Sequence, residues 1–299
     1  MSRVLQGKVA IITGSGMGIG RAIALDMARQ GASVVTNNRL ARASGGDAES
    51  TAAEITDKGG SAVVFFGDVS DYEVAREIVQ TAVRRFGNVD ILVNNAGGED
   101  KRAVPWEMAP EDWERTIRVH LTGAFNCIRH ASGPMKDQKW GRILNTTSRA
   151  WIETTEQPNY AAAMAGIVGL TRDVARDIGR YGVTCNAYSP LARTRRTNVA
   201  KQQRAYEAGL ISKEMYDMYA NVPPPEGCAP FVTYLCSEDA GGINGRIFGI
   251  KPGEIFVYSE AIEEHVLRKE SGLWTHEELV EQVPKVLLEG YVNPAPRKD

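Results

Sequence analysis

Residues 9–20 read Val9-Ala-Ile-Ile-Thr-Gly-Ser-Gly-Met-Gly-Ile-Gly20, a short apolar run followed by glycine at every second position. The apolar run is typical of a buried β-strand, and the amphipathic stretch after it, residues 21–30, is typical of a helix. Backbone N–H groups at the start of a helix bind anions, and glycine lets a pyrophosphate approach the backbone closely. A strand, a glycine-rich turn and a helix in this order predict a dinucleotide-binding site; a plain structural loop is the alternative.

The same alternation of apolar and amphipathic runs continues along the chain. The further apolar runs are residues 33–37, 62–66, 91–94, 142–147, 183–188 and 246–250. The amphipathic runs between them are residues 49–58, 73–86, 112–132 and 160–181. Because continuous apolar runs indicate strands buried on both faces, the pattern predicts an α/β fold: a doubly wound parallel sheet between two layers of helices.

We expect one domain over residues 1–253 and a C-terminal extension over residues 254–299 that packs on or between subunits. Within the domain, residues 191–227 are too long for an ordinary connection and predict a helical lid over a substrate. In the extension, Thr275 and Glu278 have the spacing of a capping box that opens a short helix.

The composition excludes several classes of function. In 299 residues, 35 Lys and Arg balance 37 Asp and Glu, so no overall charge attracts nucleic acid or an acidic membrane. The longest uncharged apolar run, residues 160–170, is too short to span a bilayer, and residues 1–8 do not resemble a secretory signal. The four cysteines have neither disulfide-framework nor metal-site spacing. We therefore expect a soluble, cytoplasmic protein without a metal, whose partner is a small molecule or another protein.

Polar residues follow the predicted strands at their carboxyl ends. Asn38 and Arg39 follow the second strand, Asp68 and Val69 the third, and residues 94–97, Asn-Asn-Ala-Gly, the fourth. In open α/β sheets, ligands bind at that edge. The sequence therefore predicts that these residues and the glycine-rich turn form one rim.

With these motifs in order, the chain resembles the short-chain dehydrogenase/reductase (SDR) family over roughly residues 5–255. Residues 13–20 match the TGxxxGxG cofactor turn of the family, Asp68-Val69 its adenine-side pair, and residues 94–97 its fourth-strand motif. The likeness is to the branch that contains the dehydrogenase domain of peroxisomal multifunctional enzyme type 2. It implies a Rossmann fold and an NAD(P)-dependent oxidoreductase that forms a homodimer or homotetramer.

The resemblance also implies a set of cofactor contacts. They are Thr13, Gly14, Ser15, Met17, Gly18, Ile19, Gly20, Asn38, Arg39, Asp68, Val69, Asn95, Ala96, Gly97, Tyr160, Pro190 and Thr194. At the end of the second strand, the family often carries an acid that binds the ribose 2′-hydroxyl of NAD. Here Asn38 takes that place and Arg39 follows, which favours NADP over NAD. The alternative is that Arg39 is a solvated loop residue.

In the family, a serine, a tyrosine and a lysine four residues after the tyrosine carry the chemistry. Ser148 and Tyr160 match the first two, but Met164 stands where the lysine is expected. A thioether brings neither charge nor a hydrogen-bond donor, so we expect an impaired oxidoreductase.

His120 occupies a place where many members carry an asparagine that anchors a proton-relay water. Imidazole titrates near neutral pH, so His120 is a candidate substitute proton carrier. A helix histidine packed against the backbone is the alternative.

Members of the branch often oxidise 3-hydroxyacyl-CoA thioesters or steroid-like alcohols, and either class is a candidate substrate. A basic run in the lid fits CoA phosphates or, alternatively, a solvated surface; it comprises Arg193, Arg195, Arg196, Lys201 and Arg204. Trp151 is expected to narrow the substrate pocket. Because of Met164, two other functions stay open: an inactive subunit that pairs with an active paralogue, and a non-redox lyase or hydratase on the same scaffold.

Overall fold

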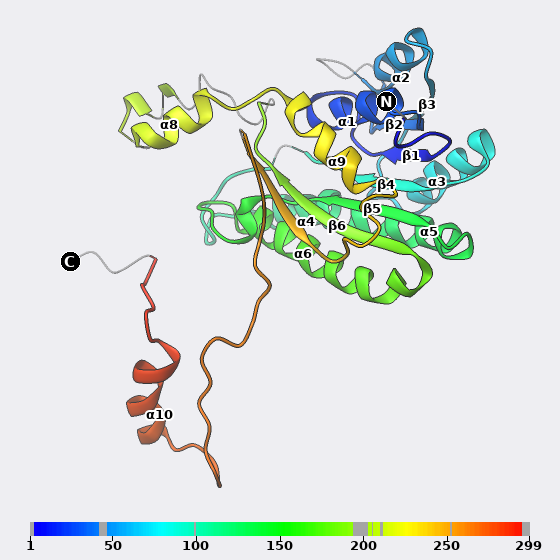
Figure 1. Ribbon diagram of the computed structural model, residues 1–299. Coiled ribbons are helices and arrows are strands. Elements are labelled where there is room, and N and C mark those ends of the chain that lie inside the picture. The colour runs from blue at the N-terminus through cyan, green and yellow to red at the C-terminus, as the bar shows by residue number, and fades with distance from the viewer. Residues whose placement is uncertain are drawn as a thin grey trace. The chain divides into compact units, whose positions relative to one another are not determined.

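The apolar runs of the sequence form one sheet in the computed structural model, as Figure 1 shows. The structure describes residues 3–41, 47–98, 100–193, 203–204, 206–209, 212–251 and 253–294. It has two compact units, Met1–Tyr258 and Ser259–Asp299. The predicted Thr194, Arg195, Arg196 and Lys201 lie outside the described residues.

In the described part of the chain the sheet has eight strands, in the order β3-β2-β1-β4-β5-β6-β7-β8. Their bounds are β1 Val9–Ile12, β2 Ser33–Asn38, β3 Ser61–Phe66, β4 Ile91–Asn94, β5 Gly141–Thr146, β6 Val183–Pro190, β7 Ile247–Lys251 and β8 Glu254–Val257. All neighbouring pairs are parallel except β7 with β8. This order, with crossovers in both directions from β1, confirms the doubly wound α/β fold.

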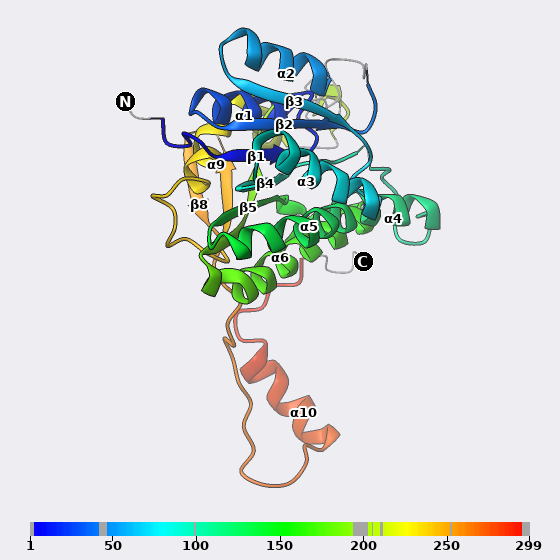
Figure 2. The same cartoon turned by 90° about the vertical axis from the view of Figure 1, so that its right-hand side faces the viewer.

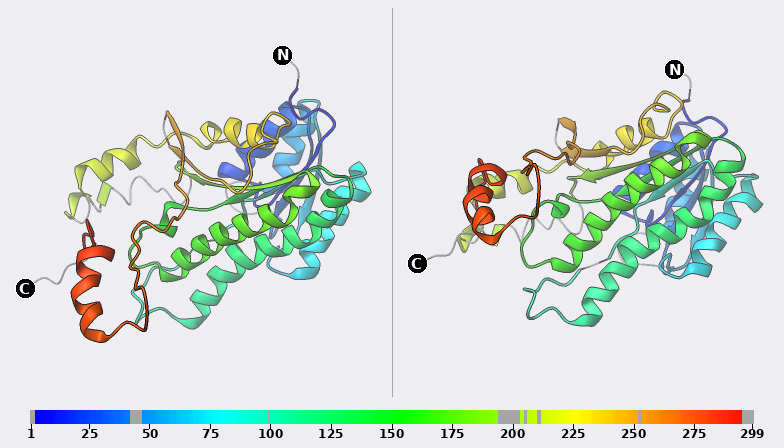
Figure 3. Two further views of the ribbon diagram at one scale, coloured as in Figure 1. Left: turned by 60° about the horizontal axis from the view of Figure 1, so that its bottom comes forward. Right: turned by 90° about the horizontal axis from the view of Figure 1, so that it is seen from below.

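Helices cover both faces of the sheet. Their bounds in the first unit are α1 Gly18–Arg29, α2 Ala48–Asp57, α3 Tyr72–Phe86, α4 Pro110–Ile117, α5 Gly123–Asp137, α6 Pro158–Ile178, α8 Lys213–Ala220 and α9 Ala229–Leu235. Buried residues of α1 and α9 pack on one face, and those of α3, α5 and α6 pack on the other. Figures 2 and 3 show these two helical layers with the sheet between them.

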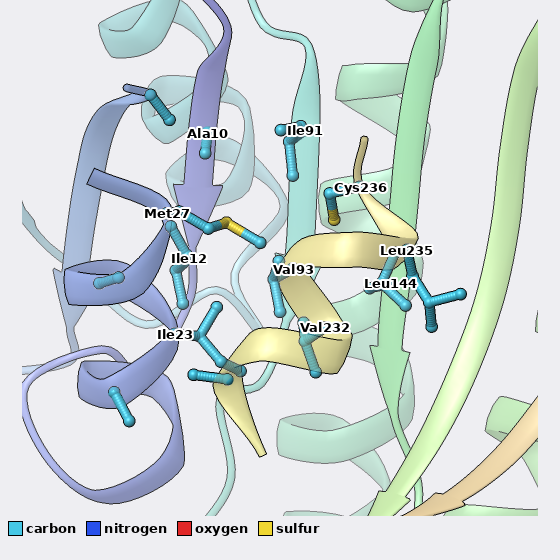
Figure 4. Packing of buried hydrophobic residues seen from close by; sticks show 14 of the residues in the cluster. Ala10, Ile12, Ile23, Met27, Ile91, Val93, Leu144, Val232, Leu235 and Cys236 are labelled. Atoms are coloured by element: carbon cyan, nitrogen blue, oxygen red, sulfur yellow. The ribbon is translucent and has the colours of Figure 1, made fainter. Parts of the chain in front are cut away.

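The core on the α1 and α9 face shows why the strands are continuously apolar. Every residue of β1 and of β4 is buried, because side chains on each face meet a helix. Figure 4 shows Ile23 and Met27 of α1 and Val232 of α9 packed against the strand residues Ile12 and Val93. Alternating polar residues in these strands would be buried without hydrogen-bond partners. A sheet covered by helices on both faces therefore requires largely apolar strands.

A chain of buried polar side chains crosses this apolar interior. Asn94 of β4 donates a hydrogen bond to Oδ1 of Asn145 on β5 at 2.8 Å. Asn145 in turn donates to Oγ1 of Thr171 on α6 at 3.0 Å. Asn145 and Thr171 are fully buried. The chain therefore ties β4 and β5 to the helix that carries Tyr160.

Two local features differ from the sequence prediction. The expected single helix over residues 112–132 is α4, a π-helical turn Arg118–Thr122 and α5 in succession. An amphipathic pattern does not reveal one extra residue in a turn, because apolar residues continue on both sides of it. In addition, β8 adds a strand beyond residue 253, so the first compact unit reaches Tyr258.

The second unit contains the predicted capping box. The Thr275 N–H donates to Glu278 Oε2 at 2.8 Å, and the Glu278 N–H donates to Thr275 Oγ1 at 3.3 Å. This box opens α10 His276–Gln282, which continues into a π-helical turn Val283–Leu287. Among the described helices of the chain, none is both long and apolar enough to cross a membrane.

The buried polar chain leads to a stability prediction. Replacing Asn145 by Ala leaves the amide of Asn94 without its partner, so we expect the free energy of unfolding to fall by about 1–3 kcal/mol. Urea unfolding measures the change, and the exposed Asn221→Ala variant is the control. Equal stabilities for these two variants would contradict the role of the buried chain.

Candidate active site

The glycine-rich turn is fixed to the end of β4 by hydrogen bonds around Thr13. Its buried Oγ1 accepts from the N–H groups of Asn95 and Ala96, each at 3.0 Å. In return, Nδ2 of Asn95 donates to the carbonyl oxygens of Thr13 at 3.0 Å and Gly14 at 3.2 Å. The two predicted motifs therefore form one structure at the carboxyl edge of the sheet.

Glycine is required in this turn because the backbone is crowded. Gly14 and Gly18 have φ of 65° and 56°, in the left-handed region. A Cβ on Gly14 would lie 2.8 Å from Cα of Ala96, and a Cβ on Gly20 would overlap Nδ2 of Asn95. The turn ends where α1 begins at Gly18, so the first N–H groups of the helix, which lack partners within it, lie at the turn, next to Met17 and Ile19.

The end of β2 presents an amide rather than an acid. Oδ1 of Asn38 is buried and has no hydrogen-bond partner within the described residues, and a Cβ on Gly16 would overlap it. Arg39 is exposed. Ser15 is held to the same strand, because its Oγ accepts from the N–H of Asn37 at 2.8 Å.

The sequence analysis missed Asp47, whose backbone lies next to Gly16. Its carboxylate caps α2 and accepts from the N–H of Ser50 at 2.9 Å. The cap spacing before an amphipathic stretch is the signal that could have identified it. This carboxylate is a helix cap close to the cofactor turn.

The third strand contributes Asp68 and Val69 to the rim. Oδ1 of Asp68 accepts from the N–H of Ser70 at 3.0 Å, which shapes the loop. The Val69 side chain is buried, and its carbonyl accepts from the buried Asn126 of α5 at 3.3 Å. Asn126, which the sequence analysis did not single out, thus connects the rim to α5.

Ser148 and Tyr160 lie on two elements that pack together. Ser148 caps the short 3₁₀ helix Arg149–Trp151, where its Oγ accepts from the N–H of Ala150 at 3.3 Å. That 3₁₀ helix contacts α6, and Tyr160 is in the first turn of α6. Ser148 follows the end of β5 as Thr13 follows the end of β1, so both lie at the same edge of the parallel sheet.

Met164 is one helical turn after Tyr160 and belongs to the core. Its side chain is buried, and its carbonyl oxygen accepts from Oγ1 of Thr147 at 3.1 Å. The backbone of α6 at this position is therefore tied to the residue before Ser148. The position where a lysine was expected contributes shape but no charge.

His120 is paired with a residue that the sequence analysis missed. Nε2 of His120 lies 3.1 Å from Oδ1 of Asp100, and both side chains are almost fully buried. The imidazole also meets the Tyr160 ring edge to face, with centroids 5.3 Å apart. His120 stands in the π-helical turn and Asp100 in the loop after β4, so no local sequence pattern links them.

The structure also describes the other predicted residues. The Trp151 ring packs edge to face on Tyr258, with centroids 5.4 Å apart. Pro190 ends β6, and the exposed Arg193 donates its N–H to the carbonyl of Pro223 at 2.8 Å. Arg204 is exposed.

The four cysteines are free and buried: Cys127, Cys185, Cys228 and Cys236. Burial raises the pKa of the Cys127 thiol to about 12 and that of Cys228 to about 11, and it raises the pKa of the other two as well. All four stay protonated at neutral pH and are poor nucleophiles. Within the described ranges, no cluster of His, Cys, Asp and Glu could hold a metal ion.

Comparison with known proteins agrees with this geometry. A sequence profile described as short chain dehydrogenase matches residues 8–208. The chain is 36% identical over 286 residues to the hydroxyacyl-CoA dehydrogenase ChsB1 of Mycobacterium tuberculosis, across 92% of this chain and 87% of that protein. It is 36% identical over 260 residues to the peroxisomal multifunctional enzyme type 2 of Mus musculus, across 83% of this chain and 32% of that protein. A crystal structure of a short chain dehydrogenase from Mycobacterium avium matches with a TM-score of 0.80 and 34% identity, and the match covers 98% of each chain.

Two adjacent glycines provide a test of the packing around His120. A Cβ on Gly97 would lie 2.8 Å from Cε1 of His120, whereas a Cβ on Gly98 would meet no described atom within 4 Å. We expect Gly97→Ala to lower the free energy of unfolding by about 1–3 kcal/mol through overpacking. Gly98→Ala is the matched control, and chemical unfolding compares the two. A larger loss in the Gly98 variant would contradict this packing.

Proposed function

The chain belongs to the short-chain dehydrogenase family, and we propose that it transfers a hydride between a nicotinamide cofactor and a hydroxyl or carbonyl substrate. The observation that carries the proposal is the position of Ser148 and Tyr160. They stand on contacting elements at the edge of the sheet where the glycine-rich turn is also held. That arrangement supports a hydroxyl donor and a proton carrier that act beside a bound cofactor.

The chain's own residues fit a nicotinamide dinucleotide. The crowded glycines and the free N–H groups at the start of α1 suit a pyrophosphate, and the unpartnered Oδ1 of Asn38 suits a ribose hydroxyl. When bound, the nicotinamide would supply the hydride acceptor or donor. Gly14, Gly18, Asp68 and the residues after β4 would hold the remainder of the dinucleotide.

We propose that NADP(H) is bound more tightly than NAD(H). A neutral amide at Asn38 does not repel a 2′-phosphate as a carboxylate would, and the exposed Arg39 offers it a guanidinium. Asp47 is near the turn, but its carboxylate already caps α2.

In the reaction, Ser148 would donate a hydrogen bond to the substrate oxygen while Tyr160 exchanges a proton with it. A tyrosine without electrostatic help ionises near pH 10, so only about one in 1,000 such side chains is ionised at neutral pH. The family's lysine supplies that help, and the buried Met164 supplies none. We therefore expect turnover reduced by about 10²- to 10⁴-fold relative to a form with the amine.

The proposed substrate is a 3-hydroxyacyl-CoA thioester or a cyclic, steroid-like alcohol. The first class is supported by the similarity to a hydroxyacyl-CoA dehydrogenase over most of both chains. The exposed guanidinium groups of Arg193 and Arg204 are available for CoA phosphates. We further propose a cytoplasmic homodimer or homotetramer in which the extension after β8, residues 259–299, packs on or between subunits.

Hydride transfer can be measured directly from nicotinamide absorbance with 3-hydroxyacyl-CoA, steroid and cyclic-alcohol panels. We expect slow turnover that Tyr160→Phe abolishes and Met164→Lys raises by about 10²-fold or more. Tyr234→Phe, on the exposed side of α9, is the matched control and leaves the rate unchanged.

The alternatives predict other outcomes of the same assay. An inactive subunit shows no Tyr160-dependent turnover alone and gains it only with an active paralogue. A lyase or hydratase forms product without any change in nicotinamide absorbance. Either result would reject the proposed oxidoreductase.

The cofactor preference is tested by binding titrations with NADP(H) and NAD(H). Arg39→Ala should weaken NADP(H) binding by about 10- to 100-fold, because one hydrogen bond to a charged group is lost. NAD(H) binding should be nearly unchanged. Asn38→Asp should reverse the preference through repulsion of the 2′-phosphate. The exposed Arg85→Ala variant is the control. Tighter NAD(H) binding by the parent protein would contradict the proposal.

A further inference from the structure

We propose that the buried pair Asp100 and His120 serves Tyr160 as a proton carrier in place of the amine that Met164 lacks. The inference rests on the proposed function and assigns a role to a residue outside the usual serine, tyrosine and lysine set. His120 contacts the reacting tyrosine, and Asp100 is a positioning residue that acts through His120.

His120 contacts both of the other groups. Nε2 lies 3.1 Å from Oδ1 of Asp100, and the side chains of His120 and Asp100 are 7% and 3% exposed. The ring of His120 meets that of Tyr160 at an interplanar angle of 73°. In the described part of the chain, the titratable groups found against this imidazole are Asp100 and Tyr160. Arg118 of the same turn contacts Ser70 instead.

The contact with Asp100 also determines which ring nitrogen of His120 carries the proton. An ionised carboxylate only accepts hydrogen bonds, so the Nε2 beside Asp100 carries the ring proton and Nδ1 keeps its lone pair. A proton from Tyr160 would therefore be accepted at Nδ1, and the contact with Asp100 keeps Nδ1 in that role.

The resulting proton path balances for alcohol oxidation. With a nicotinamide bound as hydride acceptor, the substrate C–H bond would break with its hydride going to that acceptor, and the O–H proton would go to the phenolate oxygen of Tyr160. Tyr160 would then pass a proton to the imidazole whose ring it contacts, and the imidazolium, with 7% of its side-chain surface exposed, would return the proton to solvent. Carbonyl reduction runs through the same steps in reverse.

Stability alone does not account for the pair. Burying a carboxylate and an imidazole costs desolvation free energy, and apolar side chains of similar volume fill such a space without that cost. Position 164, on α6 one turn from Tyr160, contains such an apolar side chain. The buried ion pair that contacts Tyr160 therefore lies in the π-helical turn and the loop after β4, and not at position 164 of α6.

The test is a comparison of Asp100→Asn in two backgrounds, the parent protein and Met164→Lys. In the parent, we expect kcat to fall by at least about tenfold with KM nearly unchanged, since proton transfer is lost and binding is not. In the Met164→Lys background, the amine supports Tyr160 and the same substitution should change kcat by less than about threefold. His120→Gln should follow the same pattern. Asp137→Asn, an exposed carboxylate on α5, is the matched control.

A second readout does not need turnover. With four histidines in the chain, ¹⁵N spectra of labelled protein resolve His120, which is assigned by its absence from His120→Gln. The parent should show His120 protonated at Nε2, and Asp100→Asn should give a mixture of the two tautomers. This measurement reports the positioning role of Asp100 in the folded protein.

Each outcome bears on one of the two claims. Equal loss of kcat in both backgrounds, or an unchanged tautomer in Asp100→Asn, overturns the inference and leaves the proposed hydride transfer standing. Turnover by Met164→Lys but none by the parent also overturns it, since the pair then does not replace the amine. Absence of turnover in both backgrounds rejects the proposed function, and the tautomer still decides whether Asp100 positions His120.

Discussion

The Thr13 hydroxyl determines how the site is assembled. Its buried oxygen accepts hydrogen bonds from the N–H groups of Asn95 and Ala96, so the loop after β1 is fixed to the loop after β4. These strands are neighbours in the sheet, and both are buried on each face. Polar side chains inside the sheet are hydrogen-bonded to one another, so the polar groups of the rim gather at the strand ends, and this contact fixes two of those ends together.

From that edge, buried polar contacts extend to α6, the helix that contains Tyr160. Asn94, Asn145 and Thr171 join β4, β5 and α6, and Thr147 holds the backbone of Met164. Tyr160 is therefore positioned through the backbone of α6. The fold uses the backbone carbonyl and the apolar volume of Met164, and neither requires a charge at this position.

Features encoded in consecutive residues were predictable from the sequence, and features made by distant residues were not. The strands, the glycine-rich turn, the capping box at Thr275 and the place of Met164 on α6 all follow from local patterns. Asp100 reaches His120 only through the loop after β4, and no period in the sequence links them. The extra residue in the turn Arg118–Thr122 rotates the helix but does not change which residues are apolar. The sequence of this segment therefore has the pattern of one continuous amphipathic helix.

The π-helical turn Arg118–Thr122 determines the rotation of α5 relative to α4. Each residue of an α-helix advances the direction of the side chains by about 100°. One additional residue therefore rotates α5 relative to α4, so α4 faces α6 while α5 faces α3 and the sheet. Deleting a single residue there would restore a regular α-helix but misdirect one of the two contact faces. The length of this segment, counted in residues, is thus as constrained as the chemistry of any side chain in it.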